Sequence, residues 1–202
     1  MNKLAKFSTL NNTYFALRHG ESLANVEGII VSTPENGVPK YGLSDKGQLQ
    51  VEQSIANAIL IEELGASTRI ISSDFKRAYE SAEIAYQLLS SEHPLELDAR
   101  LRERDFGDFE LKSNIHYQTV WNNDALDSSH TIDNAESADA VMQRATELIT
   151  ELESGYCGET FLLVAHGDTI QILQTAFKKY PASKQREMRH LETAEIRHLP
   201  LA

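Results

Sequence analysis

Short apolar runs and longer stretches of helical periodicity alternate along the chain. The runs Tyr14–Leu17 and Thr160–Ala165 are apolar nearly throughout and rich in strand-forming residues. Such uninterrupted runs are typical of strands buried on both faces of a parallel sheet. Shorter runs predict three further strands, at 69–71, 95–97 and 195–199.

Between these strands, apolar residues recur at helical spacing. One helix is expected from Asp45 to about Leu64, with Ser44 as its N-cap and Gly65 closing its end. The residues of its apolar face would be Leu49, Ile55, Ala56, Ile59, Leu60 and Leu64. Further helices are expected from the capping residues 72–74 to 89, over 114–121, over 138–152 after Ser137, and from a cap at 168 or 169 to about 177.

Strands that alternate with helices predict an α/β fold, here a three-layer α/β/α sandwich with a mainly parallel central sheet. At 202 residues, the whole chain 1–202 is expected to be a single domain. The glycine- and proline-rich connection 26–43 is expected to be an irregular loop that forms part of a pocket wall. The segment of about 105–134 is expected to be an elaboration of the domain, with Phe106 and Phe109 packed inward.

The charge of the chain excludes several classes of partner. The formal net charge is −11 at pH 7, whereas nucleic acids and anionic membranes select for basic surfaces. Neither is expected as a partner, and an anionic ligand would need a local basic pocket. The single cysteine, Cys157, rules out an internal disulfide and suits a reducing compartment. Because no stretch resembles a signal peptide or a membrane span, a cytoplasmic location is expected.

Basic residues able to do chemistry follow three of the predicted strands. The three clusters are Arg18-His19-Gly20, Arg77 and His166-Gly167. Since the carboxyl ends of parallel strands meet at one edge of a sheet, we expect the clusters to converge there. Two guanidinium groups match the geometry of phosphate oxygens, and a histidine can act as a nucleophile near neutral pH. Together they predict a phosphate pocket in an otherwise acidic protein.

These clusters belong to a longer ordered set of motifs. In chain order the set is Leu17-Arg18-His19-Gly20-Glu21-Ser22 with Asn25, Leu43-Ser44 with Gly47 and Gln48, Ser72-Ser73 with Arg77-Ala78, Leu101-Arg102-Glu103 with Phe106-Gly107, and Val164-Ala165-His166-Gly167. The set resembles the histidine phosphatase superfamily, the phosphoglycerate mutase-like enzymes, from Tyr14 to about Ile172. The resemblance implies a phosphoglycerate mutase-like fold and phosphoryl chemistry that needs no metal or other cofactor.

The resemblance also implies a catalytic role for five residues. His19 would attack phosphorus in line and form a phosphohistidine, with its other ring nitrogen held by an acceptor that the sequence does not identify. Arg18, Arg77 and His166 would bind the phosphoryl oxygens and stabilise the transition state. Glu103 aligns with the proton donor of the family and would protonate the leaving alkoxide, then activate the hydrolytic water.

Four further motif residues are expected to bind the substrate. They are Asn25, which would add a neutral donor, and Gly20, Ser22 and Gly167. The expected partner is therefore a small phosphorylated substrate or inorganic phosphate. Specificity is expected to reside in the loops 29–41 and 111–134, whose sequences do not define which phosphorylated compound is recognised.

The residues also bear on whether the reaction is hydrolysis or transfer. A mutase must hold a second charged group of its substrate, and in the phosphoglycerate mutases a pair of arginines downstream of the acid does so. Here no arginine lies between Arg104 and Arg144, and Lys112 is the only lysine in that span. The sequence thus favours a phosphomonoesterase, with phosphoglycerate mutase-type phosphoryl transfer as the alternative.

Two alternatives come from other classes of protein. A non-catalytic phospholigand sensor on the same fold would have no need of both His19 and Glu103. A metallohydrolase would need ligand spacing such as His-Glu-x-x-His, which the remaining histidines lack. Those histidines are interpreted as surface or packing residues: His93, His116, His130, His190 and His198.

Overall fold

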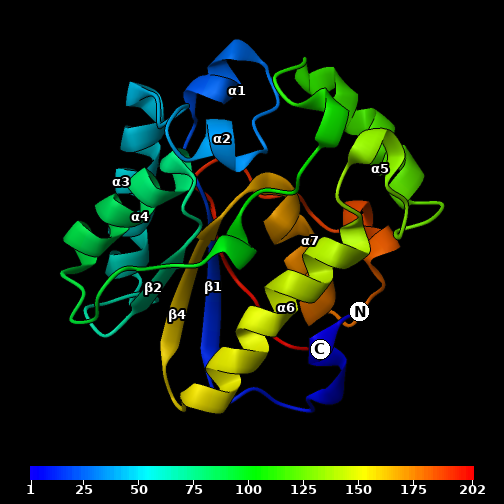
Figure 1. Cartoon of the computed structure of the whole chain (residues 1–202). Coiled ribbons are helices and arrows are strands. Elements are labelled where there is room, and N and C mark those ends of the chain that lie inside the picture. Colours follow the sequence, from blue (N-terminus) through cyan, green and yellow to red (C-terminus); the bar gives the residue numbers. More distant parts are fainter.

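A five-stranded sheet forms the centre of the computed structural model, which describes residues 1–202 (Figure 1). Its strands lie in the order β3 (Glu96–Leu97), β2 (Arg69–Ser72), β4 (Thr160–Ala165), β1 (Thr13–Arg18) and β5 (Ile196–His198). The first four are parallel, and β5 pairs with β1 in the antiparallel sense. The mainly parallel α/β sheet expected from the sequence is confirmed.

The central pair of strands sets the position of the catalytic candidates. β1 and β4 are aligned from Thr13 opposite Thr160 to Arg18 opposite Ala165. Because the two apolar runs end at the same level, the residues that follow them leave the sheet side by side. The backbone N–H of His19 donates to the carbonyl of Ala165 at 3.0 Å, which extends the ladder one residue beyond the strand.

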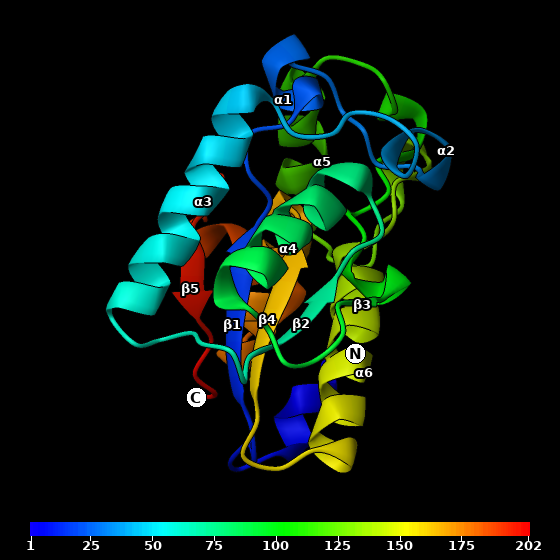
Figure 2. The same ribbon diagram turned by 90° about the vertical axis from the view of Figure 1, so that its left-hand side faces the viewer.

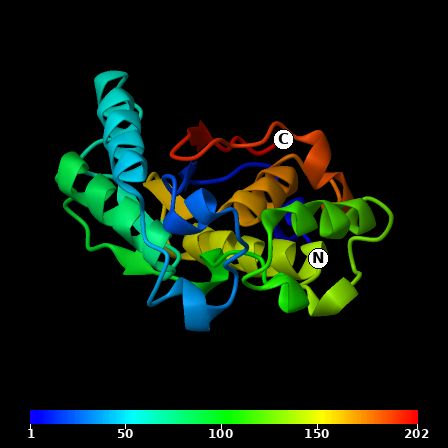
Figure 3. The same cartoon turned by 90° about the horizontal axis from the view of Figure 1, so that it is seen from above.

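Helices cover both faces of the sheet, as Figures 2 and 3 show. α3 (Asp45–Leu60) and α4 (Lys76–Leu89) cover one face, and α6 (Ala138–Gly155) and α7 (Gly167–Phe177) cover the other. Alternate residues of the strands supply the two cores, since successive side chains of a strand point to opposite faces. The three-layer arrangement follows from this alternation.

Shorter elements lie above the carboxyl ends of the strands (Figure 1). They include α1 (Leu23–Glu27), α2 (Pro34–Gly37) and α5 (Tyr117–Asp124). The short 3-10 helices are Lys3–Lys6, Ala99–Leu101, Gly107–Phe109, Asn114–His116, Ile132–Asn134 and Ala182–Glu187. None of the helices combines the length and the apolar character needed to cross a membrane.

A small separate core joins the connection 26–43 to the segment 105–134. Its buried residues are Ile30, Phe106, Phe109, Val120 and Ala135. Phe106 and Phe109 pack inward, as predicted. The connection is irregular apart from the end of α1 and the single turn α2, so these apolar contacts hold two polar segments together above the sheet.

Several local predictions were wrong. α3 ends at Leu60, four residues early, and its buried face consists of Gly47, Val51, Ile55 and Ala58. Leu49 and Leu60, predicted to be buried, are 57% and 79% exposed. The N-cap of α4 is Phe75, and that of α7 is His166 instead of residue 168 or 169.

Close backbone contact between two glycines explains the rotation of α3. A Cβ at Gly20 would lie 2.3 Å from the carbonyl oxygen of Gly47, and a Cβ at Gly47 would lie 2.0 Å from that of Glu21. The Ser44 side chain, which caps α3, also donates to Glu21 Oε1 at 2.9 Å. The first motif and the start of α3 are therefore packed backbone to backbone, which turns Leu49 away from the core.

Adding a methyl group at this contact tests the packing. We expect Gly47→Ala to lower the free energy of unfolding by about 1–3 kcal/mol, because the backbone must move to admit the Cβ. Gly65→Ala is the matched control, since a Cβ there meets no atom within 4 Å, and its effect should stay within about 0.5 kcal/mol. Urea unfolding measures both, and equal losses in the two variants would contradict the explanation.

Candidate active site

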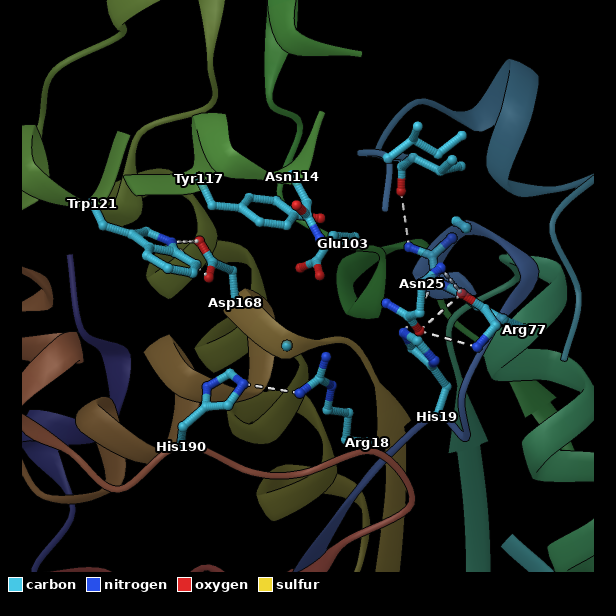
Figure 4. A pocket seen from close by; sticks show the side chains of 15 residues that line it. Arg18, His19, Asn25, Arg77, Glu103, Asn114, Tyr117, Trp121, Asp168 and His190 are labelled. Carbon is cyan, nitrogen blue, oxygen red and sulfur yellow. Dashed lines mark hydrogen bonds between the residues drawn. The ribbon is translucent and has the colours of Figure 1, made fainter. Parts of the chain in front are cut away.

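A pocket of about 180 Å³ opens at the carboxyl ends of the strands, where the three basic clusters converge (Figure 4). Its lining includes seven of the predicted site residues: Arg18, His19, Ser22, Asn25, Arg77, Glu103 and Gly167. His166 lies directly behind them, with its ring centre 5.1 Å from that of His19. Of the nine predicted site residues, only Gly20 neither lines this pocket nor lies directly behind its wall.

Hydrogen bonds on both sides of the ring fix the tautomer of His19. Nδ1 lies 2.7 Å from the carbonyl oxygen of Gly20, which can only accept. Nε2 receives a hydrogen bond of 3.1 Å from Arg77 Nε, which can only donate. The proton therefore resides on Nδ1, and Nε2 holds the free lone pair. The acceptor that the sequence could not identify is thus the carbonyl of the next residue.

Burial keeps His19 and His166 neutral. Both side chains are almost inaccessible to solvent, at 2% and 0% exposure. Burial is the main cause that lowers the pKa of each histidine well below 6.5, and the positive charge of Arg77 lowers both further. A neutral His19 with a free Nε2 is the form that can attack an electrophile.

Three buried nitrogen donors around His19 have no partner in the protein. They are Arg18 Nε, Arg77 Nη1 and His166 Nδ1. Buried donors are normally satisfied, because an unpaired one costs free energy. Their convergence, with two guanidinium charges among them, marks a site for an anion with several oxygens. The uncapped N-terminus of α7 at His166 adds to the favourable potential there.

The orientation of His166 depends on Ser73. His166 Nε2 lies 2.9 Å from Ser73 Oγ, and that oxygen already accepts a hydrogen bond from the N–H of Phe75. The Ser73 hydroxyl hydrogen can then be donated to Nε2, which leaves the imidazole proton on Nδ1. This tautomer presents an N–H to the anion site.

Arg18 is held by a segment that sequence reasoning did not assign to the site. Its Nη1 donates to the carbonyl of Leu191 at 2.7 Å and to His190 Nε2 at 2.9 Å. The interpretation of His190 as a surface or packing residue was wrong, because its ring lines the pocket. Burial and the nearby Arg18 lower the pKa of His190 to about 4, so it is neutral and can accept from Arg18.

Glu103 is fixed by the first turn of α7. Its Oε1 accepts from the N–H of Arg104 at 2.9 Å and from the N–H of Thr169 at 3.2 Å. Oε2 makes no hydrogen bond within the protein, and the residue is 9% exposed in the pocket wall. One carboxylate oxygen is thus held rigidly while the other is available for proton transfer.

The four residues expected to bind substrate take different places. Asn25 Oδ1 accepts from the Ser22 N–H and hydroxyl, both at 3.0 Å, so its amide Nδ2 is left for a ligand. Ser22 is mainly the N-cap of α1. Gly167 lies against the Arg18 guanidinium, with a Cβ position 3.6 Å from its central carbon. Gly20 serves the contact with Gly47 instead of approaching the ligand.

The wall opposite His19 contains residues that the sequence did not single out. Figure 4 shows Tyr117, Trp121 and Asp168 across the pocket from His19 and Arg77. Trp121 Nε1 donates to both oxygens of Asp168 at 3.0 Å. The spacing of these residues carries no motif: Tyr117 and Trp121 were expected only in a short helix within the segment 111–134, and Asp168 only as a possible helix cap. No group of three or more His, Cys, Asp or Glu side chains has a metal-binding arrangement.

Comparison with known proteins identifies similar sequences over most of the chain. A sequence profile described as "Histidine phosphatase superfamily (branch 1)" matches residues 14–201. The chain is 29% identical over 180 residues to the probable phosphoglycerate mutase GpmB of Salmonella paratyphi C (strain RKS4594). The matched region covers 87% of this chain and 79% of that protein. The chain is 30% identical over 166 residues to phosphoglycerate mutase-like protein 4 of Arabidopsis thaliana, with coverage of 78% and 67%.

Solved structures share the fold. Mycobacterial glucosyl-3-phosphoglycerate phosphatase in complex with VO3 matches with a TM-score of 0.76 and 24% identity, over 92% of this chain and 91% of that chain. At this identity the match establishes a common α/β architecture.

The neutral histidines make stability depend on pH. An unfolded histidine takes up a proton near pH 6.5, but His166 in the folded protein does so only at much lower pH. The free energy of unfolding should therefore be highest above pH 6.5 and fall as the pH drops below it. Between pH 6.5 and 5.5 one such histidine contributes a loss of about 1 kcal/mol.

A variant separates the contribution of His166 from that of other groups. Burial raises the pKa of Asp168, for example, and this shift makes the folded protein more stable as the pH falls, which opposes the effect of His166. In His166→Asn, the loss of stability between pH 6.5 and 5.5 should be smaller by about 1 kcal/mol. Urea unfolding in phosphate-free buffer measures the difference, since bound phosphate would stabilise the protonated ring. Identical losses in the two proteins would show that His166 is not held neutral.

Proposed function

Because the chain belongs to the histidine phosphatase superfamily (branch 1), we propose that it hydrolyses phosphomonoesters through a phosphohistidine formed on His19. The observation that carries this proposal is the unprotonated Nε2 of His19 beside three buried donors that lack partners. The similar mycobacterial phosphatase, which was solved with VO3 and with inorganic phosphate, supports a phosphoryl group as the ligand.

The first step is attack by His19 Nε2 on phosphorus, with departure of the alcohol on the opposite side. The Arg77 Nε that donates to Nε2 at 3.1 Å would turn to a phosphoryl oxygen as the substrate enters. Arg18, Arg77 and His166 would bind the three oxygens that carry the transition-state charge. Asn25 Nδ2 would add a neutral donor. The two fixed guanidinium charges supply the stabilisation for which other phosphatases use a metal ion.

In the same step Glu103 would give a proton to the leaving oxygen through Oε2, the atom left without a hydrogen bond. As a carboxylate it would then take a proton from the water that attacks the phosphohistidine, and phosphate would leave. Its position fits both tasks, because Oε1 is tied to the backbone of α7 while the residue lines the pocket.

Hydrolysis is favoured over mutase transfer by the charges in the pocket. Arg18 and Arg77 are the only lysine or arginine residues among its lining residues, and both are directed at the phosphoryl site. A mutase would need additional cations for the second charged group of a phosphoglycerate. The similarity to proteins named as phosphoglycerate mutases makes assay of 2- and 3-phosphoglycerate interconversion a necessary comparison.

Removal of His19 tests the nucleophile. His19→Ala should lower the turnover of p-nitrophenyl phosphate by a factor of roughly 10³ or more, since no other group is placed to attack. EDTA should leave the unmodified protein fully active. His198→Ala, which removes an exposed histidine of β5, is the control and should retain activity. EDTA-resistant turnover that survives the loss of His19 would exclude the mechanism, and tight phosphate binding without any turnover would favour a sensor.

Substitution of Glu103 tests the general acid. Glu103→Gln should reduce kcat for an alkyl phosphate by roughly 10²–10⁴. The effect on formation of the phosphohistidine from p-nitrophenyl phosphate should be much smaller, because p-nitrophenolate leaves without a proton. Rapid-quench measurement of the first turnover separates this step from hydrolysis. Equal losses for both substrates in the first turnover would argue against proton donation by Glu103.

A further inference from the structure

The pocket provides positive charge for only one anionic group. Arg18 and Arg77 are its only lysine or arginine residues. Arg77 donates to His19, and its Nη1 and Arg18 Nε are the buried donors without partners. A phosphoryl group bound at His19 would occupy both guanidinium groups. No further cation among the lining residues could then balance a carboxylate or second phosphate of the same substrate.

Two other arginines, Arg104 and Arg186, are already paired with carboxylates behind the wall. Arg104 donates to both oxygens of Asp124, at 2.6 and 2.9 Å, and its Nη1 lies 3.5 Å from Asp168 Oδ2. Arg186 lies over the Trp121 ring at 3.7 Å, with Nη1 3.8 Å from Asp168 Oδ1. Neither arginine lines the pocket, so their charges serve the buried carboxylates.

Carboxylates occupy the side of the pocket where the alcohol part of the substrate must lie. Figure 4 shows Glu103 and Asp168 together on the wall across from His19 and Arg77. Asp168 is 3% exposed and has both oxygens fixed by Trp121 Nε1. A second anionic group of a substrate would therefore face the carboxylate of Asp168, and juxtaposition of like charges disfavours binding.

The same wall offers uncharged hydrogen-bonding groups without protein partners. The Tyr117 hydroxyl and the Asn114 amide make no hydrogen bond within the protein, and His190 Nδ1 is buried and unpaired. Donors of this kind beside carboxylate acceptors suit alcohol hydroxyls, which both donate and accept.

The aromatic residues do not provide an open stacking surface. Tyr117 is stacked on Trp121, with ring centres 5.4 Å apart and planes 9° apart, and the Arg186 guanidinium also lies over the Trp121 ring, 3.7 Å from its centre. A flat nucleobase or a quaternary ammonium group would need a free ring face. The wall is therefore suited to a small aliphatic alcohol with several hydroxyls.

On these grounds we infer that the substrate is the monophosphate ester of a small, uncharged polyhydroxy alcohol or sugar, and that Asp168 is the residue that disfavours substrates with a second anionic group. This inference rests on the proposed phosphomonoesterase activity.

Two substrates of nearly the same shape test the inference. Glycerol 3-phosphate and 3-phosphoglycerate differ only in a terminal hydroxymethyl group or carboxylate. Release of phosphate gives kcat/KM for each, and competition with p-nitrophenyl phosphate gives an inhibition constant for each. We expect kcat/KM to favour glycerol 3-phosphate by roughly 100-fold or more, and the inhibition constants to differ in the same direction.

Variants connect this preference to Asp168. Asp168→Asn keeps an acceptor for Trp121 Nε1 but removes the charge, and should reduce the preference by roughly 10-fold. Asp133→Asn makes the same chemical change at an exposed residue whose side chain makes no hydrogen bond and should leave the preference unchanged. Asn114→Lys, on the exposed rim, adds a cation without disturbing the buried carboxylates and should also improve binding of 3-phosphoglycerate.

The outcomes separate the inference from the proposed function. If p-nitrophenyl phosphate is hydrolysed through His19 but 3-phosphoglycerate is used as well as glycerol 3-phosphate, the inference is overturned and the proposed function stands. A preference that persists in both Asp168→Asn and Asn114→Lys overturns the role of charge at this wall. Absence of turnover with all three phosphate esters overturns the proposed function and the inference together.

Discussion

Burial of His19, Arg77 and His166 beside the half-buried Arg18, at the carboxyl ends of β1, β2 and β4, is the constraint on which the site depends. Charged groups are costly to remove from water unless they are paired. The histidines meet this cost by remaining neutral, and the arginines by donating to backbone carbonyls of Val31 and Leu191. Donors remain unpaired around His19, so the arrangement is completed only by an anion. This is how a chain with a net charge of −11 can form a pocket suited to an anion.

The sequence was sufficient to predict the sheet and the convergence of its polar ends. β1 and β4 are uninterrupted apolar runs, and a parallel sheet brings the residues after such strands to one edge. The face of α3 could not be predicted in the same way. Its apolar residues permit more than one helical stripe, and the choice is made by the backbone contact between Gly20 and Gly47, which joins segments distant along the chain.

The segments 29–41 and 111–134 were expected to determine the specificity of the pocket, but the places of Tyr117, Trp121 and His190 within the pocket were not predicted, because tertiary contacts bring these residues there. His190 follows a segment without regular strand or helix periodicity, and that segment is anchored by α7: Gln171 donates to the carbonyl of Met188 and Gln174 to that of Arg189. Tyr117 packs against the small core above the sheet, and Trp121 stacks on Tyr117. Periodicity describes which face of an element is buried, but it does not describe where a long connection crosses a pocket.

The first turn of α7 connects His166 and Glu103, whose positions must stay fixed, to Asp168, which can be substituted. His166 occupies the N-cap position of this helix, and Thr169 holds Glu103 through its backbone N–H. Between them Asp168 faces the alcohol side and is itself fixed by Trp121. One helix end thus positions His166, Glu103 and Asp168, the residues to which we assign phosphoryl binding, proton donation and substrate selection. A substitution at Asp168 can therefore alter which alcohol is accepted. The backbone that aligns His166 with Glu103 keeps its place, because His166 precedes Asp168 in the helix and the N–H that holds Glu103 belongs to Thr169, which follows it.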